Sequence, residues 1–208
     1  MKFSRVTLVG CLAFSAAAQA AESIELTITG VIVPAACNPT LSKASLDFGT
    51  IPASDLTLSK NPLDPKPVTL TLTCDASASV AIKTADNRAG NTVTGTTAVY
   101  GFELATGNKK IGEYSIKAVS GNGDGTDRDV IVSSATTGPW VSVTAGNDSL
   151  DTSKFYALAP ATGLDAPGSY TTQTFNFNVT PTIEQASTLP LTSSIKLDGS
   201  VTFEVVYL

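Results

Sequence analysis

The sequence has 208 residues, and its composition argues against several classes of protein. It has 18 acidic and 13 basic residues, a formal net charge of −5 and no basic run, which argues against nucleic-acid binding. It contains no histidine, which removes Ser-His and Cys-His nucleophile pairs and the most common metal ligand. We therefore expect a protein that is not an enzyme, with no catalytic residues, no metal site and no cofactor.

The first 20 residues are typical of a secretory signal peptide. Lys2 and Arg5 supply a charged start, residues 6–18 form an apolar run, and the small residues that end at Ala20 form a cleavage site. The apolar run is shorter than the roughly 20 residues that a membrane-spanning helix needs. We expect cleavage after Ala20, with a lipoprotein signal at Cys11 as a minor alternative.

Residues 21–29, at the start of the mature chain, have the pattern of a strand. Ile24, Leu26 and Ile28 alternate with polar residues, which places the three apolar side chains on one face of an extended chain. Gly30 then interrupts the pattern. A glycine inside a strand pattern indicates a bend or a change of sheet. We therefore expect a separate extension here, followed by the domain.

Two cysteines remain after cleavage, Cys37 and Cys74, and each lies at the end of a strand-like run. An exported chain with two cysteines generally pairs them. Closing a loop of this length stabilises a fold by about 4 kcal/mol in the chain-entropy estimate. We predict a Cys37–Cys74 disulfide, with a catalytic or metal-binding thiol as the minor alternative.

Short runs with strand-like alternation fill the rest of the chain. No segment has the period of a long helix, and the 16 glycines and 11 prolines divide the chain every ten residues or so. This pattern predicts one all-β domain, a sandwich with Greek-key connections. The expected strands after the first cysteine are 44–51, 67–74, 79–83, 98–105, 112–119, 129–134, 139–145, 154–159, 173–181 and 200–208.

The middle of the chain, residues 84–160, contains two groups of residues with a functional interpretation. The polar segment 120–129 suggests a calcium loop but lacks the spacing and the terminal Glu of an EF-hand, so a solvated hairpin is preferred. Three amphipathic aromatic residues suggest a sugar platform, although positions in the sandwich core are preferred. The carboxylates and amide are Asn122, Asp124, Asp127 and Asp129, and the aromatic residues are Tyr114, Trp140 and Tyr156.

The chain ends in its clearest strand pattern, residues 201–208. Alternate apolar residues share one face, and no further strand follows them. Termini usually fray unless something ties them down. One physical interpretation joins this strand with the early start of the first one: the domain lacks a strand of its own, and its extension completes another copy by β-strand addition.

Four stretches carry a resemblance to a known family: LTITGVIVPAAC (26–37), LDFGTI (46–51), PVTLTLTC (67–74) and GSVTFEVVYL (199–208). They resemble the pilin subunits of bacterial chaperone–usher fimbriae of the type 1-like group. The shared features are an alternating donor segment, a glycine before the first domain strand, two cysteines about forty residues apart, and a C-terminal strand with a penultimate tyrosine. The order and spacing span nearly all of the mature chain.

The resemblance implies an incomplete immunoglobulin-like β-sandwich that lacks its last strand and is completed by a donor strand from another subunit. In the family, a periplasmic chaperone lends a strand to the open groove, and the next subunit's extension replaces it at an outer-membrane usher. The donor strand would carry Ile24, Leu26 and Ile28. The strand that borders the groove and pairs with the chaperone would carry Val201, Phe203, Val205, Tyr207 and Leu208. Basic residues of the chaperone would bind the terminal carboxylate of Leu208.

We therefore expect a structural fimbrial subunit that polymerises by donor-strand exchange and has a role in adhesion. Residues 1–20 would be the signal peptide, 21–29 the donor-strand extension and 30–208 the pilin-like domain. The expected partners are the chaperone, the usher, other pilin subunits and a host receptor, and the destination is the cell surface by way of the periplasm. The alternative is a self-sufficient secreted β-sandwich that binds a carbohydrate or a host surface.

Overall fold

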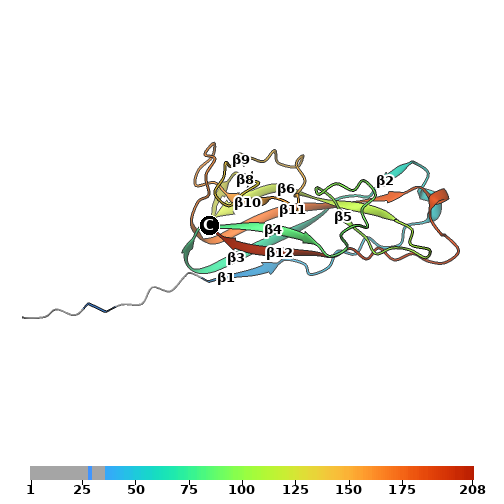
Figure 1. Ribbon diagram of the computed structural model, residues 1–208, viewed down its shortest axis with the longest axis horizontal. Coiled ribbons are helices and arrows are strands. Elements are labelled where there is room, and N and C mark those ends of the chain that lie inside the picture. Colours follow the sequence, from blue (N-terminus) through green and yellow to red (C-terminus); the bar gives the residue numbers. More distant parts are fainter. Residues whose placement is uncertain (1–27, 30–35) are drawn as a thin grey trace, which may run out of the picture. The chain divides into compact units, whose positions relative to one another are not determined.

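The computed structural model describes residues 28–29 and 36–208 (Figure 1). The extension expected at residues 21–29 therefore lies almost wholly outside the described residues. Residues 36–208 belong to one compact unit, which spans residues 34–208. Its strands are β1 (Cys37–Leu41), β2 (Lys60–Pro62), β3 (Lys66–Ala78), β4 (Val80–Asp86), β5 (Tyr100–Gly101), β6 (Gly112–Gly123), β7 (Thr126–Arg128), β8 (Val130–Ser133), β9 (Val141–Ser142), β10 (Phe155–Leu158), β11 (Tyr170–Glu184) and β12 (Val201–Tyr207).

The strands form two antiparallel sheets. The first has the order β1-β3-β11-β6-β5, with β2 added beside β11 and β7 beside β6. The second has the order β12-β4-β10-β8-β9, so that the C-terminal strand is at its edge. Two short 3₁₀ turns, Ala53–Asp55 and Ala186–Thr188, complete the elements. The prediction of an all-β domain built from two packed sheets is confirmed.

The core between the sheets comes from the alternation of the two longest strands. In β11, Phe175 and Phe177 point inward and are buried, whereas Asn176 and Asn178, which alternate with them, are only half-buried. β3 follows the same rule with its buried leucines. Fully burying one such side chain stabilises the fold by about 1.5–3 kcal/mol. The second sheet closes the core with Val80, Ile82, Tyr156 and Leu158.

A disulfide links the two neighbouring strands β1 and β3 of the first sheet, near the start of the domain. Cys37 and Cys74 lie directly opposite each other where β1 pairs with β3, and their sulfur atoms are bonded. This confirms the pairing predicted from the sequence. The bond ties β1, which is the edge strand of this sheet, covalently to β3.

The aromatic residues considered as a sugar platform are buried. Tyr114 and Tyr156 belong to the core between the sheets, and Trp140 covers a separate apolar cluster with Ala81 and Ala157. The preference for core positions is confirmed.

The polar loop that follows β6 is a hairpin turn between β6 and β7. The carboxylate of Asp124 in this turn accepts hydrogen bonds from the backbone N–H groups of Thr171 and Thr172 and from the Thr171 hydroxyl, all in β11.

Several expected strands are wrong in extent. Residues 44–51 form no strand, and the strands expected at 98–105 and 139–145 shrink to two residues each. Alternating apolar and polar residues indicate an extended chain with one buried face, but a strand also needs a neighbouring strand with which to form backbone hydrogen bonds. Within the described part of the molecule, no strand lies beside 44–51, which leaves that segment at the margin of a groove.

Candidate binding groove

An apolar groove with a volume of about 1060 Å³ runs between two segments of the domain. One wall is the chain that follows β1, residues 41–51, and the other is the chain from 189 to 203, which ends in β12. Buried side chains from β3, β6 and β11 form its base. These base residues include Val68, Ile116, Val179 and Ile183.

β12 borders this groove with an unpaired edge. It lies beside β4 (Figure 1) and pairs with it from Val201–Asp86 to Tyr207–Val80. Within the described residues, no strand pairs with its other edge. The flanking bonds, Asn87 N–H to Ser200 C=O and Leu208 N–H to Ser79 C=O, fix which groups face β4. Because bonding alternates along an antiparallel pair, the even-numbered residues bond to β4 and the N–H groups of the odd-numbered ones face outward.

The predicted groove-bordering residues divide into two groups. Val201 and Phe203 line the groove, and Val205, which does not line it, is half-buried against the core. Tyr207 is 50% exposed, and its hydroxyl oxygen accepts a hydrogen bond of 2.8 Å from the N–H of Cys37. Leu208 is exposed too, and it donates its N–H to the carbonyl of Ser79.

Phe203 connects the wall to the core. Its ring stacks on Phe177 of β11 with 5.7 Å between the ring centroids and an interplanar angle of 21°. The ring is half-buried, because its outer part faces the groove. An apolar side chain placed in the groove would complete its burial.

The opposite wall is held without strand pairing. Leu46 and Ile51 pack half-buried side chains against the core, and Phe48 is half-buried as well. The ammonium group of Lys66, at the start of β3, donates to the carbonyl of Asp47 and lies 4.9 Å from the centre of the Phe48 ring. Side chains therefore anchor the segment, and its backbone pairs with no strand in the part of the chain that the structure describes.

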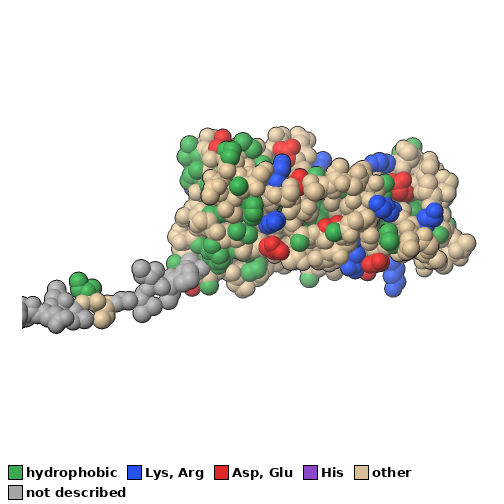
Figure 2. All heavy atoms as spheres, in the orientation of Figure 1, with side chains coloured by type: hydrophobic (Ala, Val, Ile, Leu, Met, Phe, Trp, Pro, Cys, Tyr) green, Lys and Arg blue, Asp and Glu red, His purple; other side chains and the backbone are tan. Residues whose placement is uncertain are grey.

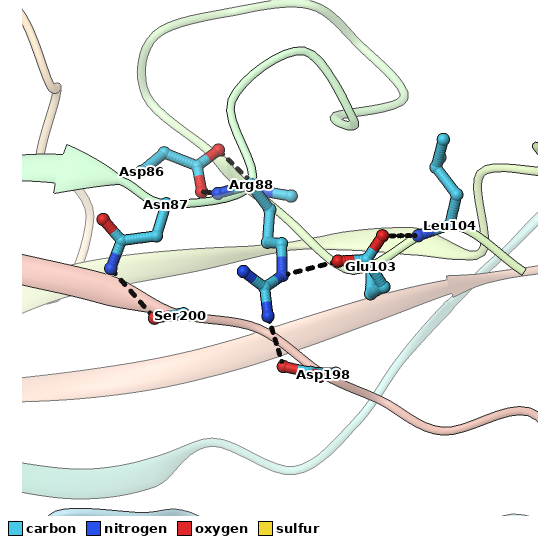
Figure 3. A network of polar contacts seen from close by, with 8 residues as sticks. Asp86, Asn87, Arg88, Glu103, Leu104, Asp198 and Ser200 are labelled. Atoms are coloured by element: carbon cyan, nitrogen blue, oxygen red, sulfur yellow. Dashed lines mark hydrogen bonds and ion pairs between the residues drawn. The ribbon is translucent and has the colours of Figure 1, made fainter.

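A polar cluster fixes the chain that enters β12 (Figure 3). The guanidinium of Arg88 contacts the carboxylates of Glu103 and Asp198, each at 3.0 Å. The amide of Asn87 donates to the hydroxyl of Ser200 at 2.9 Å. Exposed pairs contribute only about 0.2–1 kcal/mol each, but here they act together on one segment. They hold the residues before β12 against the loop between β4 and β5.

Gly199 lets the wall segment before β12 pack closely on the base of the groove. A Cβ atom at this position would lie 2.6 Å from Cε1 of Tyr114 and 3.2 Å from the ring of Phe102. Both aromatic rings are buried and line the groove. Burial raises the pKa of the Tyr114 hydroxyl well above its usual value, and the nearby Asp86 carboxylate raises it further. Tyr114 therefore adds no charge to the base of the groove.

Sequence reasoning missed most of the base. Its residues on β6 and β11 have the pattern of ordinary core strands, and only the fold shows that some of them form the base of a groove. In the sequence, Gly199 stands out only as part of the stretch 199–208. The signal for its close packing on Tyr114 is a glycine directly before a strong strand. The predicted donor residues Ile24 and Leu26 lie outside the described residues, and Ile28 is 88% exposed.

The arrangement suits binding more than catalysis. The described ranges, 28–29 and 36–208, contain no group of three or more Cys, Asp or Glu side chains that could hold a metal ion. They also contain no helix long and apolar enough to cross a membrane. Acidic and basic side chains are interspersed on the face shown in Figure 2. An apolar groove beside a free strand edge can bind an extended chain through main-chain bonds and alternate side chains.

Comparison with known proteins gives matches along the whole chain. Residues 26–115 match a family described as "Protein of unknown function (DUF1120)". The chain is 31% identical to "Protein GltF" of Escherichia coli (strain K12) over 94% of its own length and 92% of that protein. It is 24% identical to "Uncharacterized protein YhcF" of the same organism over 98% of both chains. Among solved structures it is similar to the P pilus rod subunit PapA, with 16% identity, a TM-score of 0.45, and coverage of 88% of this chain and 99% of that one.

Proposed function

We propose a structural role for this chain, which belongs to the same protein family as GltF of Escherichia coli: it is a pilin-like subunit that polymerises by donor-strand exchange. The observation that carries the proposal is the free edge of β12 beside an apolar groove. In this proposal the groove accepts residues 21–29 of a second copy. Residues 1–20 are the signal peptide, and 30–208 are the accepting domain.

The sequence of the extension suits such a groove. Ile24, Leu26 and Ile28 alternate, and alternate residues of a strand are about 6.6 Å apart on one face. Burying three such side chains would supply roughly 5–9 kcal/mol before the costs of association and ordering are subtracted. The outward N–H groups of β12 would add main-chain bonds worth about 0.5–1.5 kcal/mol each.

The exposed edge of β12 and the apolar groove beside it explain why we propose partners for this chain. A free strand edge next to exposed apolar surface is a site of aggregation. A periplasmic chaperone would cover it during export, and an outer-membrane usher would exchange the chaperone for the next subunit. The product is a fibre on the cell surface, where adhesion would be its use.

The test compares two forms of the mature chain, residues 21–208 and the same chain with Leu26→Asp. The unmodified chain should form linear oligomers by light scattering and sedimentation. The variant should remain a non-donating monomer whose groove still binds a peptide of residues 21–30, because only its donor strand carries a carboxylate that the apolar groove excludes. A chain that stays monomeric with slowly exchanging outward amides in β12 would contradict the proposal and favour a self-sufficient binding module.

A further inference from the structure

We propose that consecutive copies also contact each other end to end, through an exposed apolar pair at each end of the domain: Tyr207 and Leu208 of the donating copy pack against Leu58 and Leu191 of the accepting copy. This inference rests on the proposed function, because insertion of residues 21–29 brings the two ends together. It adds a second interface to the groove, and the partner is a second copy of this chain.

The end of the domain from which the extension leaves carries the first pair, Tyr207 and Leu208, which we call the root pair. Tyr207 is 50% exposed and Leu208 is 40% exposed. The Tyr207 hydroxyl accepts a hydrogen bond of 2.8 Å from the N–H of Cys37, the first residue of β1. The N–H of Leu208 donates to the carbonyl of Ser79. The root pair therefore lies beside the point at which the extension joins the domain.

The other end of the domain carries the second pair, Leu58 and Leu191, which we call the exit pair. Leu58 is 63% exposed and Leu191 is 43% exposed. The N–H of Ala186 donates to the carbonyl of Leu56 at 3.1 Å, which joins the two 3₁₀ turns that precede these leucines. Figure 1 shows β2, which follows Leu58, toward the end of the domain away from the C-terminus. Leu191 lines the groove and Leu58 does not, so the exit pair extends the groove onto the outer surface.

The direction of the donor strand decides which end of the groove the donating copy lies against. All strand pairs among the described residues are antiparallel. A donor that follows this rule runs antiparallel to β12, and its last residues then lie beside the start of β12. From there the groove continues along the segment 189–197, which contains Leu191. The donor therefore leaves the groove at the exit pair.

The connection between the donor strand and its own domain is short. The seven residues 30–36, which separate the strand from Cys37, can span at most about 25 Å. The root pair of the donating copy is therefore held near the exit pair of the accepting copy. Four side chains are too few to join two free copies, since stable interfaces bury about 1,200–2,000 Å². A short tether raises the effective concentration to roughly the millimolar range, which makes a small contact sufficient.

The contact gives the assembled chain a defined joint between neighbouring domains. Domains that share only a short connection move relative to each other by default. Packing the root pair on the exit pair restricts that motion, and it covers apolar surface that each copy would otherwise expose at both ends. The contact forms only after the donor strand has been inserted, because the tether is what makes it favourable.

Chemical cross-linking of the mature chain tests this geometry. The two native cysteines are already paired, so Leu58→Cys with Leu208→Cys adds one free thiol at each end. A short bis-maleimide reagent should then join neighbouring copies into a ladder of covalent oligomers. The matched control is Val119→Cys with Leu208→Cys, because Val119 is also exposed but lies in the middle of β6. This control should give no ladder, and neither should the Leu58/Leu208 variant in the non-donating Leu26→Asp chain.

The substitution Leu58→Gln measures what the contact contributes to assembly. Leu58 lies outside the groove, so in the Leu26→Asp chain this variant should bind the peptide of residues 21–30 as tightly as its parent. Oligomers of the mature chain that carry Leu58→Gln should dissociate roughly three- to tenfold faster on dilution, because an apolar contact between the domains is lost. The matched control Val119→Gln should leave the dissociation rate unchanged.

The possible failures separate the contact from the proposed function. Oligomers that give no ladder, or that dissociate no faster with Leu58→Gln than with Val119→Gln, would overturn the end-to-end contact alone. A ladder of equal intensity in the Leu26→Asp chain would overturn it too, since the contact would then not depend on insertion. A mature chain that forms no oligomers, with a groove that binds no peptide, would overturn the proposed function as well.

Discussion

Truncating Phe203 should cost more stability when the groove is filled than when it is empty. In the domain alone the ring is half-buried and stacks on Phe177. Removing a fully buried phenylalanine side chain costs about 3–5 kcal/mol, so a half-buried ring should cost roughly 2 kcal/mol. A bound donor covers the rest of the ring, and the cost of Phe203→Ala should then rise to about 3–5 kcal/mol.

Urea unfolding of the Leu26→Asp chain, with and without saturating peptide of residues 21–30, measures both values. Phe175→Ala is the matched control, because that ring is fully buried and does not line the groove. Its cost should be about 3–5 kcal/mol in both conditions. Equal costs for Phe203→Ala with and without peptide would refute the reasoning, since they would mean that the donor does not touch the ring.

Three further substitutions test the parts that shape the groove. Arg88→Gln should lower the free energy of unfolding by only about 1 kcal/mol, while hydrogen exchange at the start of β12 becomes faster; unchanged exchange would show that the cluster positions nothing. Gly199→Val should lower stability by about 1–3 kcal/mol, because its Cβ would overlap Tyr114; urea unfolding with an unchanged midpoint would contradict this close fit. Replacing Cys37 and Cys74 with alanine should cost about 4 kcal/mol for the loop of 37 residues, and a thermal midpoint equal to that of the oxidised parent would show that the bond is not a structural one.

The strongest strands could be predicted because alternation and pairing agree in them. β3 and β11 alternate buried and less buried residues along most of their length, and each has a partner strand on both sides. Their patterns therefore reported both burial and strand structure. β12 could also be predicted, because its apolar face packs against the core, although β4 is its only partner strand among the described residues.

The segments around the groove could not be predicted in the same way. Residues 44–51 alternate like a strand, but their inward side chains pack while their backbone finds no partner strand in the described part of the chain. The base of the groove comes from β6 and β11, which are far apart in sequence and meet only in the folded sheet. The short strands β2 and β7 have too few residues to show any period.

Hydrogen exchange at single residues of β12 tests the central claim most directly. The N–H groups of Phe203 and Val205 face away from β4, whereas those of Thr202 and Glu204 bond to it. In the Leu26→Asp chain the two outward amides should exchange rapidly, and a saturating peptide of residues 21–30 should slow them by at least about tenfold, with little change at Thr202 and Glu204. Outward amides that are already as slow as those of β3 without peptide, or that stay fast when the peptide is bound, would contradict donor-strand exchange at this groove.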